Sequence, residues 1–340
     1  MKVIKKAKLE KVLEVLSKDY DVYVPMQRGA QTGFFSFRTY NEDYDDIMLD
    51  ILNVYQPPKS VVFPQTEKMY NFKEAGQKIS IDRVPQASEL KIIFGLRSCD
   101  LKAIDCLDTL FFTKEYEDEF YRSRRDNTVM IVNACYNPGT NCFCSSMGVS
   151  PDNPETADVL IHDVGDGDFA WEAKSAKGEA VTELIKELLA EQEVTLPTLK
   201  AFKRKVDYEG VAEKLKDMFD HPMWEDLSYP CHNCGICTYM CPTCYCFDIQ
   251  VKTTGEEGYR LRCWDSCMYR EYSQMAGGHN PRELDKERFR NRFLHKLQFF
   301  PERYGEPLCT GCGRCIVVCP AGVNIVKIIE KVKEADISNG

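Results

Sequence analysis

The chain has 340 residues and a formal net charge of −9, so it is long enough for two domains and lacks the basic excess of nucleic-acid-binding proteins. Hydrophobic residues make up 44% and charged residues 29%, as is typical of globular proteins. No apolar stretch approaches the ~20 residues that span a bilayer, and no export signal is visible. We therefore expect a cytoplasmic protein that binds neither membrane nor nucleic acid.

The first half of the chain mixes helical and strand patterns. Within residues 4–18, Leu9, Val12, Leu13 and Leu16 repeat at helical spacing. Strand-like runs between turn residues cover 21–25, 60–63, 78–81, 90–94, 128–132, 159–162 and 169–171, and the last two read as a hairpin. Helices are expected at 101–112, 179–193 and 207–219. These patterns predict a mixed α/β domain over residues 1–205.

Beyond about residue 205 the pattern changes. Strand signals largely disappear, cysteines become frequent, and a charged helix is expected around residues 282–296. The arginine-rich stretch 288–292 of this helix is expected to be a solvated face rather than a docking surface. We therefore expect an α+β fold with a second, mainly helical domain over residues 206–340.

Seventeen cysteines are unusual for such a chain, and eight of them form two copies of the run C-x2-C-x2-C-x3-C-P. The first copy is Cys231, Cys234, Cys237 and Cys241, and the second is Cys309, Cys312, Cys315 and Cys319. This run holds [4Fe–4S] clusters in bacterial-type ferredoxins, where the fourth cysteine binds the other cluster. Structural zinc is the alternative, but a zinc ribbon needs only pairs of C-x2-C.

Following this crossed rule, we assign two clusters. Cys231, Cys234 and Cys237 with Cys319 hold cluster 1, and Cys309, Cys312 and Cys315 with Cys241 hold cluster 2. The 67 residues between Cys241 and Cys309 exceed the gap in compact two-cluster ferredoxins and indicate a helical insertion. Cluster loading should therefore be coupled to folding of the whole module.

Two further groups of cysteines are open to two interpretations. Cys99, Cys135, Cys142 and Cys144 follow strand ends or lie in a loop, so they either hold a third cluster or are buried small hydrophobes, as we expect for Cys106. Cys244, Cys246, Cys263 and Cys267 have aromatic neighbours, which favours packing over a fourth cluster.

Several motifs beyond the ferredoxin runs are typical of one family. The chain resembles the iron–sulfur β subunit of cytosolic NiFe sulfhydrogenases and, less closely, an iron–sulfur subunit of anaerobic sulfite reductases. The motifs are 57–59, 93–95 with Cys99 and Asp100, 142–144, 221–224, 241–244, 264–267, 276–280, 288–292 and the run from Cys309. The resemblance implies an α-helical ferredoxin-like second domain and favours a third cluster at Cys99, Cys135, Cys142 and Cys144. Cys263 departs from the family pattern, which weakens a fourth cluster.

The resemblance also implies a function. Family members relay electrons from one partner to another, between a flavin/NAD(P)-binding subunit on one side and a catalytic subunit, a hydrogenase or reductase, on the other. The sequence has no G-x-G-x-x-G after a strand, so we expect no FAD or NAD bound by this chain. No catalytic residues are assigned, because the five histidines are scattered and no nucleophile–base pair is evident. The alternatives are a sulfite reductase subunit, a reductase using a site-differentiated cluster itself, and a zinc scaffold.

Overall fold

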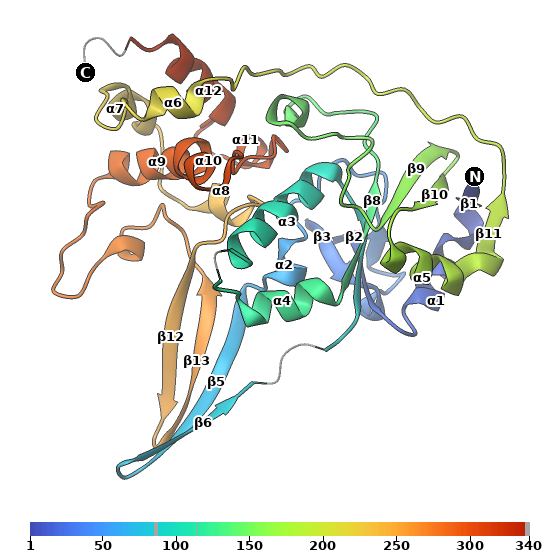
Figure 1. The fold of residues 1–340 in the computed structure, drawn as a ribbon, viewed down its shortest axis with the longest axis horizontal. Helices are drawn as coiled ribbons and strands as arrows, with labels where there is room; N and C mark the ends of the chain where they lie inside the picture. The colour runs from blue at the N-terminus through green and yellow to red at the C-terminus, as the bar shows by residue number, and fades with distance from the viewer. Residues whose placement is uncertain (85–87, 114, 337–340) are drawn as a thin grey trace. The chain divides into compact units, whose positions relative to one another are not determined.

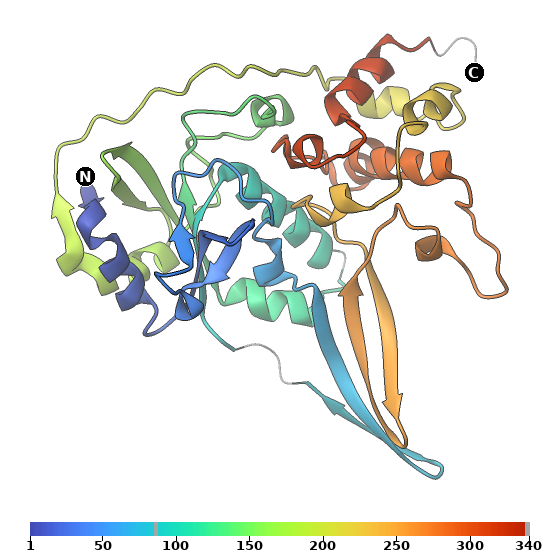
Figure 2. The ribbon, with the colours of Figure 1, turned by 180° about the vertical axis from the view of Figure 1, so that it is seen from behind.

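The computed structural model, drawn as a ribbon in Figures 1 and 2, describes residues 1–84, 88–113 and 115–336. The chain divides into two compact units. Unit 1 comprises Met1–Val62, Ser88–Val206 and Cys309–Arg314, and unit 2 comprises Phe63–Ala87, Asp207–Leu308 and Cys315–Gly340. The division expected from the sequence was contiguous, whereas each unit consists of three separate segments. Both units combine helices and strands, in agreement with the expected α+β class.

Unit 1 is built on a twisted sheet in the order β11-β1-β10-β9-β8-β7-β2-β3, with β4 also paired to β2. The neighbours β2–β7, β7–β8 and β8–β9 are parallel, and the remaining pairs are antiparallel. The strands are β1 (Lys2–Ile4), β2 (Asp21–Arg28), β3 (Gln31–Ser36), β4 (Asp45–Ile47), β7 (Lys91–Leu96), β8 (Thr128–Asn133), β9 (Val159–Gly165), β10 (Asp168–Ala173) and β11 (Leu189–Glu191).

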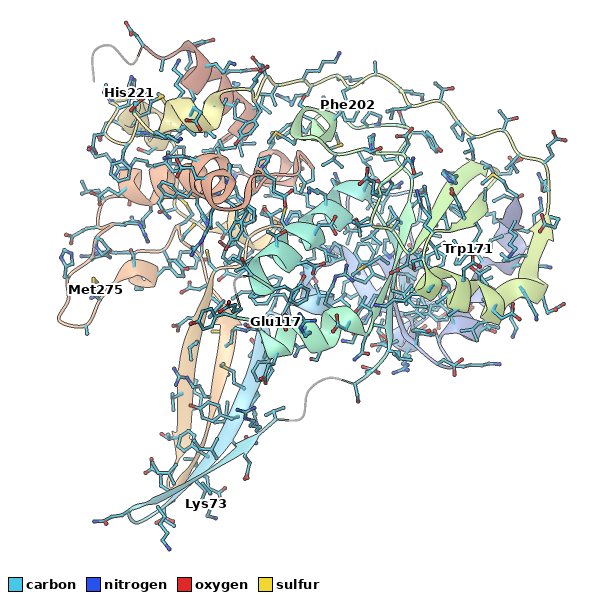
Figure 3. The ribbon with its side chains drawn as sticks, in the orientation of Figure 1. Lys73, Glu117, Trp171, Phe202, His221 and Met275 are labelled. Atoms are coloured by element: carbon cyan, nitrogen blue, oxygen red, sulfur yellow. The ribbon has the colours of Figure 1, made fainter. Side chains whose placement is uncertain are left out.

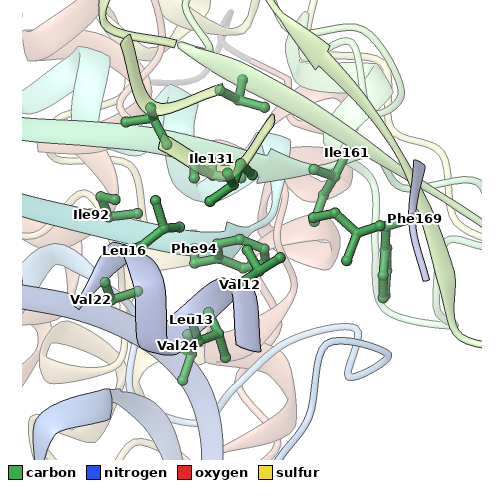
Figure 4. Packing of buried hydrophobic residues seen from close by; sticks show 14 of the residues in the cluster. Val12, Leu13, Leu16, Val22, Val24, Ile92, Phe94, Ile131, Ile161 and Phe169 are labelled. Atoms are coloured by element: carbon green, nitrogen blue, oxygen red, sulfur yellow. The ribbon is translucent and has the colours of Figure 1, made fainter. Parts of the chain in front are cut away.

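The helices of unit 1 are α1 (Leu9–Leu16), α2 (Lys59–Val62), α3 (Ser98–Phe111), α4 (Glu119–Asp126) and α5 (Ala176–Ile185). Three of them, α1, α3 and α5, pack against this sheet, while α2 and α4 pack against each other. Helix α1 places Val12, Leu13 and Leu16 against Ile92 and Phe94 of β7, as Figure 4 shows. These side chains are fully buried, so the expected helical spacing of α1 is confirmed.

The parallel strands β7 and β8 bring two cysteines to one edge of the sheet. Strand β7 leads directly into α3, whose second residue is Cys99, and Cys135 follows the end of β8 by two residues. Because β7 and β8 pair in parallel, their carboxyl ends meet at the same edge. Open α/β sheets bind ligands at such edges. Two adjacent strand ends therefore present Cys99 and Cys135 at one edge of the sheet.

Unit 2 contains an antiparallel sheet in the order β12-β13-β5-β6, whose strands lie side by side in Figures 1 and 2. The strands are β5 (Thr66–Ala75), β6 (Lys78–Arg83), β12 (Phe247–Thr254) and β13 (Glu257–Trp264). At the base of the sheet the ring of Phe63 stacks on Trp264 and the buried Arg262 forms an ion pair with Glu67. Lys73, labelled in Figure 3, pairs with Glu257 near the opposite end.

The helices of unit 2 are short apart from two. They are α6 (Val211–Leu215), α7 (Met223–Ser228), α8 (Ile236–Tyr239), α9 (Asp285–Leu294), α10 (Phe300–Tyr304) and α12 (Ile325–Glu334), while α11 (Arg314–Val317) begins at the last residue of unit 1. A π-helical turn, His295–Phe299, connects α9 directly to α10. No described helix has the length and apolarity needed to cross a membrane.

Most strand predictions of the first half are confirmed, including the hairpin of β9 and β10. The strand expected at 60–63 is wrong, because residues 59–62 form α2 after Pro57 and Pro58, and proline favours a helix start. The expected loss of strands beyond residue 205 is also wrong. Strands β12 and β13 are joined by a two-residue turn that begins at Gly255, and apolar Phe247, Ile249 and Val251 alternate with polar residues along β12, a strand signal that the expectation of a mainly helical second domain overlooked.

Two expected helices are shorter than predicted. The helix expected over 179–193 ends at Ile185 and gives way to a 3-10 turn and strand β11. The helix expected over 207–219 is limited to α6, Val211–Leu215. Between β11 and α6, residues 192–210 form an extended connection without helix or strand, which is clearly seen in Figure 1.

Candidate metal centres

One cavity of unit 2 is lined by all four cysteines that the sequence assigned to cluster 1: Cys231, Cys234, Cys237 and Cys319. Apolar side chains, among them Phe289 and Phe293, form the rest of its wall together with Arg292. The fourth cysteine is thus brought from the second run to the first three, as the crossed rule predicts. Cys315 also lines this cavity.

The loop that carries the first three cysteines requires its glycine. Gly235 has φ +72° and opens α8, and an added Cβ would lie 2.8 Å from the ring of Tyr269. At the other end of the set, the backbone N–H of Val323 donates to Cys319 Sγ at 3.2 Å. Such N–H···S bonds stabilise a thiolate and are a known influence on cluster potential. Burial raises the pKa of the Cys231 thiol, so a cationic metal is needed for its ionisation.

A second cavity, in unit 1, is lined by the upstream set of Cys99, Cys135, Cys142 and Cys144. Three of these thiols are at most 8% exposed, and Cys135 is half-buried. Burial raises the pKa of Cys144 to about 12, and also raises that of Cys99, Cys135 and Cys142. The structure therefore gathers all four thiols, in a site that favours ionisation only beside a metal.

A fifth thiol, Cys312, lines the same cavity, which the sequence did not indicate. Two glycines allow its segment to approach the loop of Cys144. An added Cβ on Gly311 (φ +66°) would lie 2.6 Å from the Cα of Cys144, and one on Gly313 would lie 2.4 Å from the carbonyl oxygen of Asn141. The Phe143 N–H donates to the Gly311 carbonyl at 2.9 Å. Phe202, labelled in Figure 3, packs against Cys99 and Cys144 in the same unit.

The set assigned to cluster 2 has members in both units. Cys309 and Cys312 belong to unit 1, and Cys241 and Cys315 belong to unit 2. Its composition stays a prediction from the spacing of the two runs.

Buried arginines in unit 1 carry positive charge next to the thiols. Arg314 lies between Cys312 and Cys315 in the chain and forms a two-point ion pair with Asp100, at 2.5 and 2.8 Å. Arg97 lines the second cavity and donates to the carbonyls of Leu49, Ile51 and Ala134. An oxidised four-thiolate [4Fe–4S] site carries about two negative charges, so a cluster there would supply an anion for Arg97.

The remaining cysteine group of unit 2 does not surround a described cavity. The Cys267 side chain hydrogen-bonds to Cys246 and lowers its pKa to about 6 despite burial, and Cys244 hydrogen-bonds to Cys241. Cys263 lies on β13, partly exposed. Direct thiol–thiol contact suits packing better than a cubane, which holds its ligands apart.

Over residues 1–84, 88–113 and 115–336, no three histidine, cysteine or carboxylate side chains converge in the manner of a site for one metal ion. A single tetrahedral zinc would hold its sulfurs about 2.3 Å from one centre. A cubane cluster is larger and needs a cavity between its thiols. Each of the two four-cysteine sets lines such a cavity in its own unit.

Comparison of the sequence with known proteins shows to which family the chain belongs. Residues 230–323, which include both cysteine runs, match the model of the 4Fe-4S dicluster domain. Sulfhydrogenase 2 subunit beta of Pyrococcus furiosus is 30% identical over 325 residues, which cover 92% of each protein. The chain therefore belongs to the sulfhydrogenase β-subunit family. No solved structure matches it significantly.

Proposed function

We propose that this protein is an iron–sulfur electron-transfer subunit of a soluble multi-subunit oxidoreductase, of the hydrogenase type. It would relay electrons between two partners, one a flavin/NAD(P)-binding subunit, the other a catalytic subunit. The observation that carries the proposal is the pair of cavities, each lined by four cysteine thiols, in a chain with a dicluster domain. Bound [4Fe–4S] clusters would supply one-electron sites there.

The position of Cys312 supports electron exchange between the upstream site and cluster 2. This cysteine is assigned to cluster 2, and it lines the cavity of the upstream set. Gly311 and Gly313 let the two ligand loops meet at backbone distance. Two clusters held by these loops would be separated by little more than a thiol, which favours rapid electron exchange.

Each set of four cysteines also has one member that is more accessible to solvent than the others. A relay needs such a position, because electrons must pass to and from partner subunits at the protein surface. In unit 2 this is Cys234, the exposed member of its set. In unit 1 it is Cys135, which also lines a polar cavity of about 590 Å³ together with Lys200 and Lys203. The remaining thiols of both sets are at least partly shielded from water, which protects the clusters. We propose these two edges as the points of electron exchange with partner subunits.

The alternatives remain distinct in their chemistry. The iron–sulfur subunit of an anaerobic sulfite reductase would use the same relay with another acceptor. A reductase using its own cluster would turn over substrate without a partner, and Cys135 beside the polar cavity is the observation that favours this candidate. A zinc scaffold would not carry electrons at all.

Anaerobically reconstituted protein is expected to bind about twelve irons and twelve acid-labile sulfides per chain, and to show reducible, EPR-active clusters. Metal analysis and EPR of the reduced protein measure this directly. Zinc in place of iron, or fewer than about eight irons, would contradict the relay. Reduction of a small substrate by the isolated protein would replace it with the enzyme alternative.

The third cluster has its own test. Replacing Cys142 by alanine should lower the iron content by about four per chain, because the upstream cavity loses one of its four ligands. The matched control is Cys106→Ala, which removes a fully buried thiol on α3 that lines neither cavity. Equal iron in both variants would show that the upstream set is packing.

A further inference from the structure

Helix α9 and the π-helical turn that follows it carry three buried cations at intervals of four positions, Arg288, Arg292 and Lys296, and the last two lie near thiols. Arg292 is 4% exposed and Lys296 is 3% exposed, and both belong to unit 2. Positions i and i+4 lie on one helical face. The arginine-rich stretch was expected to be a solvated face, and the burial of Arg288 and Arg292 shows that this was wrong.

Arg292 lacks the partners that a buried guanidinium requires. It lines the four-cysteine cavity, its Nε has no hydrogen-bond partner, and it forms no ion pair with any described residue. Among the described residues, its guanidinium contacts the ring of Phe293, whose centroid lies 4.5 Å from the Cζ of Arg292. The groups acting on its charge are cysteines: Cys237, Cys241, Cys244 and Cys315. An unpaired buried charge costs several kcal/mol, so Arg292 needs an anion in this position.

The other arginines of α9 differ from Arg292. Arg288 is buried, but it donates to the carbonyls of Met268, Arg282 and Glu283 and pairs with Asp285. Arg290 donates to the carbonyl of Phe219 and pairs with Asp220 at 3.0 Å. Arg292 alone of the three faces thiols instead of oxygen acceptors.

Lys296 binds a predicted cluster ligand directly. Its Nζ donates to Cys241 Sγ at 3.3 Å, to Thr243 Oγ1 at 2.8 Å and to the Leu308 carbonyl at 3.1 Å. The adjacent His295 adds no charge, because burial and then the Lys296 charge lower its pKa to about 4. Because the charge of Arg288 is paired with Asp285, the positive charge of this face that is directed at thiols resides on Arg292 and Lys296.

We propose that Arg292 and Lys296 are the counter-charges of the two ferredoxin-type clusters and set their potentials. The proposal rests on the proposed function, since it presumes that the cysteine sets hold clusters. Lys296 acts on cluster 2 through its N–H···S bond to Cys241. Arg292 lines the cavity of cluster 1, which Cys315 of the cluster 2 set also lines, so its charge acts on both clusters. A cation close to a cluster favours its more negative, reduced state and thus raises the reduction potential of the cluster.

Anaerobic redox titration followed by EPR tests this with R292M, R292K, K296M and the control R290M. At a fixed potential in the titration range, R292M should lower the reduced-to-oxidised ratio of both clusters about tenfold or more. K296M should lower it for cluster 2 only, and R292K should recover most of the loss. R290M should match the wild type. Unchanged ratios in R292M at full iron content would overturn the proposal.

A second measurement does not depend on the clusters being reduced. Without iron, R292M should melt at a higher temperature than wild type, because it removes an unpaired buried charge. With clusters loaded, the order should reverse. If R292M binds no clusters at all, two further variants decide. Cluster binding by R292K but not by R292Q would support the proposal, because only lysine keeps the positive charge. Failure of R292K to bind clusters would overturn the proposal. Wild-type protein that binds no clusters would instead overturn the proposed function, so the two failures are distinguishable.

Discussion

Replacing Asp100 by asparagine is expected to lower the free energy of unfolding of the iron-free protein by about 3–5 kcal/mol. Asp100 is 1% exposed, and its two carboxylate oxygens accept from both terminal nitrogens of the buried Arg314. The variant keeps the shape of the side chain and leaves the guanidinium charge buried with the Val54 carbonyl as its remaining described acceptor. Denaturant unfolding monitored by circular dichroism measures the loss.

Two controls separate this charge effect from other causes. Glu257→Gln breaks an ion pair with Lys73 whose two side chains are more than half exposed, so it should leave the free energy of unfolding close to that of the wild type. The double variant D100N/R314M removes both charges and should recover most of the stability lost in D100N. A loss below about 1 kcal/mol in D100N would show that the buried pair does not hold unit 1 together.

Replacing Gly311 by alanine is expected to have a similarly large effect, and one that also reaches the metal content. Its φ of +66° costs an L residue about 1–2 kcal/mol, and the added Cβ would lie 2.6 Å from backbone atoms of Cys144. The clash should add roughly 1–3 kcal/mol and push the segment of Cys312 away from the Cys142–Cys144 loop. We expect lower thermal stability and a loss of about four irons or more per chain.

Gly322 offers a matched control for this substitution. It has nearly the same φ, +67°, but an added Cβ would have no heavy atom within 4 Å. Gly322→Ala should therefore lose only the stability that a positive φ costs an L residue, and its iron content should match that of the wild type. Equal behaviour of the two variants would mean that the close approach of the two ligand loops has no structural importance.

The sequence predicted the chemistry of the site better than its surroundings. Cysteine spacing is local information, and the crossed rule correctly anticipated that Cys319 lies with Cys231, Cys234 and Cys237 around one cavity. The strand ends that present Cys99 and Cys135 could likewise be read from periodicity. The approach of Cys312 to the upstream set could not, because it depends on two glycines meeting a loop about 170 residues away in the chain.

The charges around the thiols were missed for a similar reason. A stretch such as Arg288–Arg292 is usually a solvated helix face, and only the structure shows that Arg288 and Arg292 are buried. The strands β12 and β13 were missed although apolar and polar residues alternate in both, as Phe247, Ile249 and Val251 show in β12, because the nearby cysteine runs favoured a helical module. The two-residue turn at Gly255 was a second signal.

The sheet of unit 2 has a consequence for the order of events during synthesis. Its hairpin of β5 and β6 is made early, but the partner of β5 is β13, and about 170 residues separate Arg83 from Glu257. At ~5–20 residues per second, a ribosome needs roughly 10–35 s to synthesise these intervening residues. During that interval the hairpin has an open edge, and its charged side chains, such as Lys73, Lys78 and Arg83, hinder pairing with another chain. If Cys319 holds a cluster as proposed, its iron can be delivered only later still, after almost the whole polypeptide has emerged.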